Sequence, residues 1–217
     1  MLLKNNYLHF ILIAFLSFLF AYEYNSFIQT DTLISQSLSE KYTQEIINNS
    51  LNIRQTWLWV GYIFAPVILY LTTIFIAFVV LIVIWIYYMN ETNFDVKFSN
   101  VWRIVLFAQW STLAAAFIKI FWFGVICSDY TLEYLSSFYP LSIINFFDIN
   151  TLDKLFIYPI SLINLFELAY WIILVVGVKK LLNQTYLKSF EIVFLSYGIL
   201  LIIWIVAMMF ISINLTN

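Results

Sequence analysis

The sequence predicts an all-α fold, a polytopic bundle of transmembrane helices. Hydrophobic residues make up 64% of the 217 residues and charged residues only 10%, whereas soluble domains carry about 25% charged residues. Long apolar runs alternate with short polar segments, and the 8 Trp and 15 Tyr fit repeated crossings of the membrane interface. We therefore expect one transmembrane domain over residues 1–217.

Five apolar runs are each long enough to be considered a membrane span, which takes roughly 20 residues. They are residues 7–22, 57–88, 104–126, 156–178 and 192–213. The first run has bulky residues, Phe18 to Phe20, where a signal peptide would need small ones before its cleavage site. It is expected to be an uncleaved span.

Two segments between the spans are expected to lie outside the membrane. In residues 23–55, Ile34, Leu38, Tyr42 and Ile46 recur every four residues, which predicts an amphipathic helix, with Ser37 and Glu40 as a candidate capping box. This helix either rests on a surface or docks a partner.

The second segment, residues 127–155, is too apolar for an open loop. We expect one or two short interfacial helices, broken at Pro140 and resumed after Asn150, whose side chain would cap the turn at Thr151. A re-entrant segment is the less favoured alternative, because irregular backbone exposed to lipid is costly.

Lysine and arginine positions predict the orientation, since these residues are enriched in cytoplasmic loops. With the N-terminus inside and the C-terminus outside, the inner side holds Lys4, Lys97, Arg103, Lys179, Lys180 and Lys188, and the outer side holds Lys41, Arg54 and Lys154. The opposite orientation would reverse this bias.

Two charged residues fall within predicted spans. Glu167 is at the centre of residues 156–178, with Asn164 on the same helix face. Lys119 shares a small, polar face with Gln109, Thr112 and Ala116, expected to turn toward other helices. Because an isolated charge at this depth costs at least ~2.5–3.5 kcal/mol, we expect Lys119 and Glu167 to face each other, with Asn164 assisting.

The role of this intramembrane polar group, Lys119, Glu167, Asn164 and Gln109, is open at this point. It is interpreted first as a structural clasp that fixes helix register, and second as a proton or cation site in a transport path. A contact with lipid headgroups is a further alternative. Helix-breaking Gly and Pro residues are scarce within the spans, which argues against a carrier built on broken helices. Pro159 is expected in a first helical turn, where proline is tolerated.

The composition excludes several kinds of site. One cysteine, Cys127, and one histidine, His9, cannot supply the three or four nitrogen and sulfur ligands of a protein zinc site. His9 is expected to be an interfacial residue. No catalytic, cofactor-binding or metal-binding motif is present, and the net charge of -2 gives no basic surface for nucleic acid. We expect no enzyme activity and no cofactor.

The C-terminal part resembles a known family. The runs FYPLS at residues 138–142 and LINLFELAYW at 162–171, then Gly177-Val178 and Ser189-Phe190, are similar to the closing half of Yip-domain membrane proteins. The resemblance implies five spans with the N-terminus cytosolic, and a role as a trafficking scaffold in eukaryotic members. A first span followed by an outer segment departs from the soluble N-terminal region expected in that family.

The expected function is a non-enzymatic membrane scaffold or an accessory subunit of a membrane complex. The alternative is a small transporter or channel component that uses Glu167 as an intramembrane site. Expected partners are the lipid bilayer and other membrane proteins or further copies of the chain. Richness in Ile, Asn, Lys and Phe indicates an AT-rich genome and favours a bacterial inner membrane.

Overall fold

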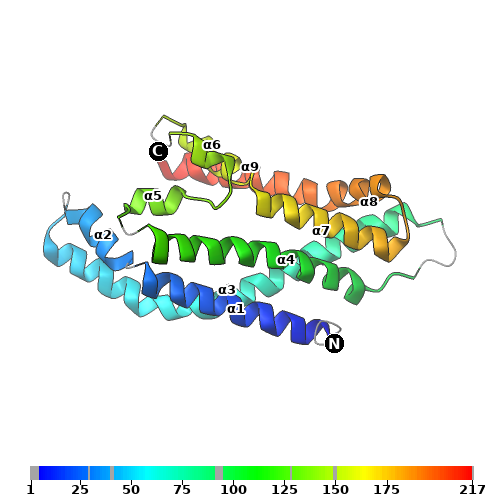
Figure 1. Ribbon diagram of the computed structural model, residues 1–217, viewed down its shortest axis with the longest axis horizontal. Helices are drawn as coiled ribbons and strands as arrows, with labels where there is room; N and C mark the ends of the chain where they lie inside the picture. Colours follow the sequence, from blue (N-terminus) through cyan, green and yellow to red (C-terminus); the bar gives the residue numbers. More distant parts are fainter. Residues whose placement is uncertain are drawn as a thin grey trace.

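A computed structural model describes residues 5–28, 30–39, 42–90, 95–127, 129–148 and 151–216, and every regular element in these ranges is a helix (Figure 1). The all-α class is therefore confirmed. The α-helices are α1 (Asn6–Phe27), α2 (Thr30–Ser39), α3 (Gln44–Tyr87), α4 (Phe98–Phe121), α5 (Leu132–Ser137), α6 (Lys154–Ser161), α7 (Leu165–Leu182), α8 (Tyr186–Val193) and α9 (Ile199–Thr216). Two π-helical segments, Trp122–Ile126 and Phe194–Gly198, extend α4 and join α8 to α9, and Ile143–Phe146 is a 3-10 helix.

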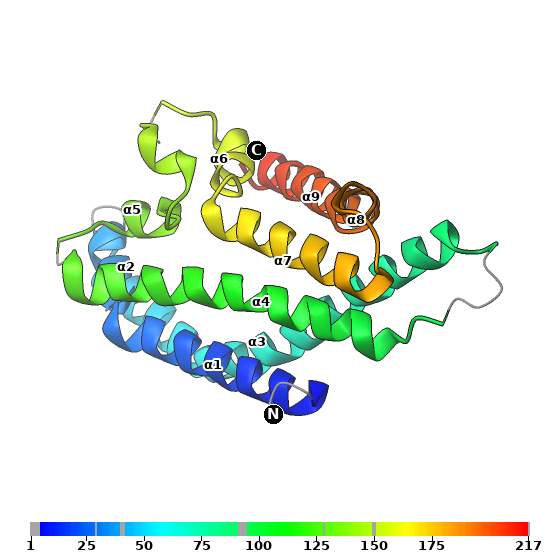
Figure 2. The same cartoon turned by 45° about the vertical axis from the view of Figure 1, so that its right-hand side comes forward.

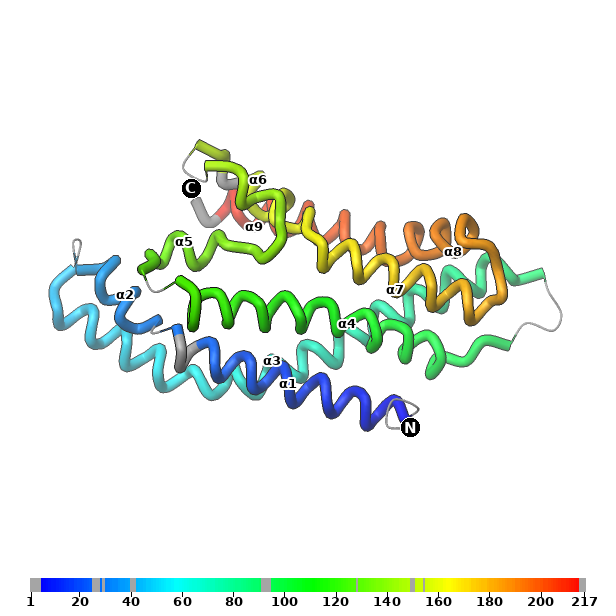
Figure 3. Tube along the Cα trace, in the orientation of Figure 1, coloured from blue at the N-terminus to red at the C-terminus, as the bar shows by residue number. Residues whose placement is uncertain are grey.

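The long helices form an elongated bundle. Helices α1, α4 and α9 run in one direction along its long axis, and α3 and α7 run in the other (Figure 3). Helix α4 is central and packs against α1, α3 and α7 (Figure 2). One large apolar core joins these elements, with fully buried side chains such as Ile13, Ile84, Val105, Leu174 and Ile192.

Among the described residues, four helices are long and apolar enough to cross a membrane, by length and composition. They cover Asn6–Tyr24, Gln44–Tyr87, Phe98–Ile126 and Tyr186–Asn214, and they coincide with four of the predicted spans. A chain with such helices has the build of a membrane protein. Helix α7 is not among the four, and its 18 residues include Glu167, Lys179 and Lys180. The number of spans and the orientation of the termini stay predictions.

The prediction of one continuous helix over residues 156–178 is wrong. The chain instead forms α6 and α7, separated by residues 162–164. Pro159 lies inside α6 and not in its first turn, so it removes a backbone donor and crowds the preceding turn, and α6 ends two residues later. Asn164 then has extended backbone and caps α7, because its Oδ1 accepts from the Glu167 backbone N–H at 2.8 Å.

The amphipathic helix predicted within residues 23–55 is also divided. Residues 30–39 form α2 and α3 begins at Gln44, so Ile34 and Ile46 lie on different helices. Ser37 is not an N-cap, since it lies inside α2 and its hydroxyl donates to the Ile34 carbonyl at 2.9 Å. Glu40 lies outside the described residues.

Helix α2 folds back along the first turns of α3. Asp31 on α2 forms an ion pair with Arg54 of α3 and accepts a hydrogen bond from Gln55 Nε2 at 2.9 Å. Helix α2 also contacts α5. A second, small apolar core beside them includes Ile28 and Leu135. We call α2, residues 44–56 and α5 the outer tier, after the side of the membrane on which the sequence predicts them.

The segment from residue 127 to 155 contains the short helices that were expected. Helix α5 precedes Pro140 and the 3-10 helix Ile143–Phe146 follows it. The Tyr130 hydroxyl donates to the Ile28 carbonyl at 3.3 Å, and burial, with a smaller effect of Cys127, raises the pKa of Tyr130. Asn150, the expected cap, lies outside the described residues.

Candidate functional site

The break between α6 and α7 is held together by a second piece of chain, residues 141–143. The Ile143 N–H donates to the Ile163 carbonyl at 3.1 Å, and the Leu165 N–H donates to the Leu141 carbonyl at 3.2 Å. The Ser142 hydroxyl donates to the Ser161 carbonyl at 3.0 Å. These bonds satisfy backbone groups at the break that intrahelical hydrogen bonds would satisfy in a continuous helix. The break is therefore stabilised by its own hydrogen bonds.

Glu167 lies in the first turn of α7, directly after this break. Its Oε1 atom accepts hydrogen bonds from the Tyr197 hydroxyl at 2.8 Å and from Trp171 Nε1 at 3.0 Å. A carboxylate in the first turn also lies at the positive end of the helix dipole. Two neutral donors and a helix terminus therefore surround this acid, in place of the lysine that was expected.

Tyr197 reaches Glu167 from a π-helical segment, Phe194–Gly198. Such segments add a residue to a helical turn and occur frequently at functional sites. The neighbouring Gly198 makes room for Trp171, because a Cβ at Gly198 would lie 2.7 Å from Trp171 Cη2. The sequence spacing puts Trp171 one helical turn after Glu167, so their contact could be predicted. No feature of the sequence predicted the contact of Tyr197 with Glu167.

The level of Glu167 in the bundle follows from the packing of α4 against α7. These helices are antiparallel (Figure 2). Gly177 packs directly on Ile104. Glu167 precedes Gly177 by ten residues, so it lies level with about residue 114 of α4 at the helical rise. That level is near the middle of the apolar helix Phe98–Ile126. The acid is therefore far from both ends of α4.

An apolar groove of about 480 Å³ lies beside the carboxylate. It is lined by residues of the break, of the paired segment 141–143, of α7 and α8, and of the π-helical segment Phe194–Gly198, among them Leu141, Ile163, Asn164, Leu168, Trp171 and Phe194. Glu167 is the one acid among the described residues that line this groove. The arrangement can hold a carboxyl group in a fixed position, and it can exchange a proton only where a proton acceptor or donor gains access to the groove.

The predicted contact between Lys119 and Glu167 is not formed. Lys119 lines a separate groove of about 340 Å³ together with Gln109, Thr112 and Ala116, so the predicted shared face exists. This groove is bounded by α1 and α3 residues such as Tyr24 and Leu69, and not by α7. The Lys119 ammonium lies 5.4 Å from the centre of the Tyr139 ring. The polar group of the prediction is thus divided between two sides of α4.

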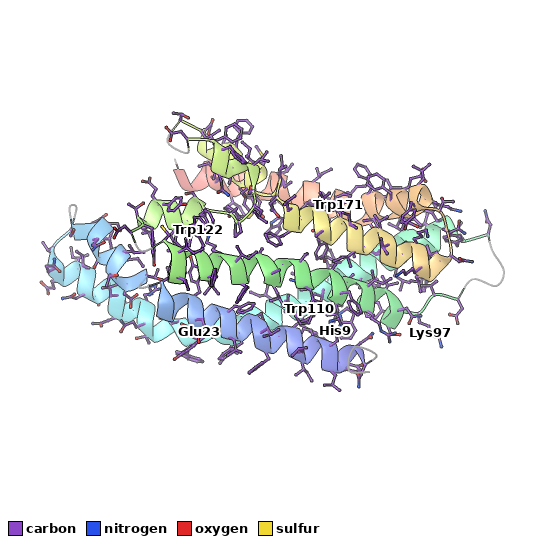
Figure 4. The ribbon with its side chains drawn as sticks, in the orientation of Figure 1. His9, Glu23, Lys97, Trp110, Trp122 and Trp171 are labelled. Carbon is purple, nitrogen blue, oxygen red and sulfur yellow. The ribbon has the colours of Figure 1, made fainter. Side chains whose placement is uncertain are left out.

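The His9 side chain, which is expected to lie at the membrane interface, is buried against α4, and its position relative to the membrane stays a prediction. It is 1% exposed, and its Nε2 atom accepts a hydrogen bond from Trp110 Nε1 at 2.7 Å (Figure 4). Nearby, Arg103 Nε donates to Asn6 Oδ1 at 2.7 Å. These two bonds join α1 to α4. The sequence placed His9 near a helix end but gave no sign of its partner, which lies about a hundred residues away.

Within the part of the chain that the structure describes, no group of three or more His, Cys, Asp or Glu side chains is placed to hold a metal ion. Comparisons with known proteins find no match: no family model, no curated protein and no solved structure is similar to the chain. The resemblance to Yip-domain proteins stays a prediction.

Proposed function

We propose that the protein is a non-enzymatic integral membrane scaffold or an accessory subunit of a membrane complex. It would cross the bilayer five times, through α1, α3, α4, α6 with α7, and α8 with α9, with the N-terminus inside and the C-terminus outside. The alternating direction of these helices supports an odd number of crossings (Figure 1). Its location would be a bacterial inner membrane.

The observation that carries this proposal is the outer tier. Helix α3 has 44 residues and is about 66 Å long, whereas a bilayer with its headgroups is about 40–45 Å thick. Residues 44–56 are the polar end of that helix, and Asp31, Arg54 and Gln55 fasten α2 to it. A preformed helical platform outside the membrane is suited to holding a partner, because little ordering is required on binding.

The bonds of Glu167 also fit a structural role. Tyr197 and Trp171 use the carboxylate to connect α7 with the segment between α8 and α9. The clasp interpretation is kept, with these two residues as partners in place of Lys119. In a scaffold, such a clasp would fix the relative position of the helices that carry the outer tier.

The break between α6 and α7 favours the second candidate, a small transporter or channel component. Carriers place discontinuous helices at their sites, and an acid in the first turn of the second half is a suitable position for a proton or cation. In that case Glu167 would be reached by water and would change its bound proton or ion during transport.

The proposed scaffold role predicts a stoichiometric partner bound through the outer tier. Asn48 and Asn52 lie one turn apart and both are exposed on residues 44–56. Replacing both by Glu adds charge to this face with little influence on topology, which follows Lys and Arg. After purification in mild detergent, the parent should run as a complex heavier than the 25.7 kDa chain, and N48E/N52E should lose the partner without a change in thermal stability.

The matched control is Asn90→Glu, which changes an exposed asparagine three residues beyond the opposite end of α3 and should leave the complex intact. A parent protein that purifies as a single chain with no partner would contradict the scaffold role. Equal loss of the partner in Asn90→Glu would contradict the assignment of the outer tier as its binding surface.

A further inference from the structure

A further groove lies between α4 and α7, on the side of the bundle near the α4 N-terminus. Its volume is about 720 Å³, within the range of about 300–1,000 Å³ that is typical of ligand pockets. Asn100, Arg103 and Phe107 line it from α4, and Ile172, Val176 and Lys180 line it from α7. None of the described residues that form it belongs to the Glu167 groove.

The groove is polar at one end and apolar along the rest. Because Gly177 lies level with Ile104 and the helices are antiparallel, Lys180 is level with about residue 101 and Ile172 with about residue 109. Arg103 and Lys180 are therefore within about one helical turn of each other along the axis. Phe107 and Ile172 extend the groove from this basic end toward the middle of the bundle.

Arg103 and Lys180 place two positive charges on the lining of this end of the groove. The Arg103 side chain is oriented by its Nε donation to Asn6 Oδ1 at 2.7 Å, and Asn6 Nδ2 donates in turn to the Ser99 carbonyl. Lys180 is exposed. The first turn of α4, with Asn100, adds the positive end of a helix dipole to the same place.

We propose that this groove binds one anionic phospholipid, with the phosphate against Arg103 and Lys180 and an acyl chain along Phe107 and Ile172. The two cations match the negative charge of the lipid phosphate, and the apolar part of the groove matches the shape of an acyl chain. Basic pockets between transmembrane helices on the cytoplasmic side bind anionic headgroups, and the proposed orientation places this end there. The inference rests on the proposed membrane orientation and does not depend on the scaffold role.

Native mass spectrometry of the protein in detergent, titrated with dioleoyl phosphatidylglycerol, tests the proposal. The parent should retain one phosphatidylglycerol more tightly than dioleoyl phosphatidylcholine. Lys180→Gln should weaken the binding of phosphatidylglycerol about fivefold, as expected for one lysine near a lipid phosphate. Lys180 is exposed, so this variant should keep the parent's thermal stability.

Two further variants separate the two parts of the site. Lys97→Gln removes an exposed charge at the same end of the bundle but outside the groove, and should bind phosphatidylglycerol as the parent does (Figure 4). Val176→Phe should reduce binding by filling the apolar part while both cations remain.

Equal retention of phosphatidylcholine and phosphatidylglycerol would overturn the charge recognition. Binding of glycerol phosphate alone as tightly as the lipid would show a phosphate site and not a lipid site. Equal weakening by Lys97→Gln would indicate a general surface attraction. None of these results bears on the partner at the outer tier, so the two proposals fail separately.

Discussion

Glu167→Ala is expected to lower the free energy of unfolding by about 2–4 kcal/mol, because it removes the acceptor for two donors in the protein interior. The Tyr197 hydroxyl, on a residue only 8% exposed, and Trp171 Nε1 would both lose their partner. Glu167→Gln keeps an oxygen at the acceptor position and is expected to cost less than about 1 kcal/mol.

Thermal unfolding in detergent, followed by tryptophan fluorescence, measures these differences. At about 2–4 °C per kcal/mol for a chain of this size, Glu167→Ala should lower the midpoint by about 5–15 °C. Glu45→Ala is the matched control, since Glu45 is also in a first helical turn but is exposed, and it should change stability by less than about 1 kcal/mol. If Glu167→Ala is as stable as the parent, Glu167 does not act as a clasp.

Gly177→Ala is expected to destabilise the protein by about 1–3 kcal/mol through overpacking. A Cβ at Gly177 would overlap Cγ2 of Ile104, so α4 and α7 are in direct contact at this position. Ile104 is branched at Cβ, so its side chain has few alternative rotamers with which to move away. Thermal unfolding again provides the measurement.

Two further variants identify the cause. Ile104→Ala removes the overlapping atoms, so the double variant with Gly177→Ala should lose less stability than the sum of the two single variants. Gly61→Ala is the control for helix propensity, because nothing lies within 4 Å of a Cβ at Gly61, and this variant should be neutral or slightly stabilised. Additive losses at residues 104 and 177 would mean that α4 and α7 do not pack in this way.

The parts of the fold that hydropathy controls could be predicted. Long apolar runs without charges predict membrane-spanning helices. For this reason α1, most of α3, α4 and α9 were expected close to their observed positions. The helical period also placed Gln109, Thr112, Ala116 and Lys119 on one face, and these residues do line one groove.

The partner of Glu167 could not be predicted, for a geometric reason. The period of a helix tells which of its residues share a face, but not toward which neighbour that face is turned. On α4, Lys119 faces the α1 side, whereas Glu167 on α7 meets Tyr197 from a π-helical segment. No residue pattern in the sequence predicts the π-helical segment, so the side-chain position of Tyr197 could not be predicted.

The break in residues 162–164 was not predicted, because the apolar composition of residues 156–178 favoured one continuous helix over the helix-end residues within it. Pro159, Ser161 and Asn164 are each compatible with a helix end, and together they end α6 and begin α7. The hydrogen bonds from residues 141–143 that stabilise the break come from about twenty residues earlier in the chain. Such a long-range contribution is absent from any local pattern.

The central claim is that Glu167 is an internal clasp in a scaffold and not an ion site in a transport path. Proton and cation flux into proteoliposomes, compared between the parent and Glu167→Gln, tests it most directly. Neither protein is expected to raise the flux above that of protein-free vesicles. Flux through the parent that Glu167→Gln abolishes, with unchanged thermal stability, would contradict the claim and establish the transport alternative.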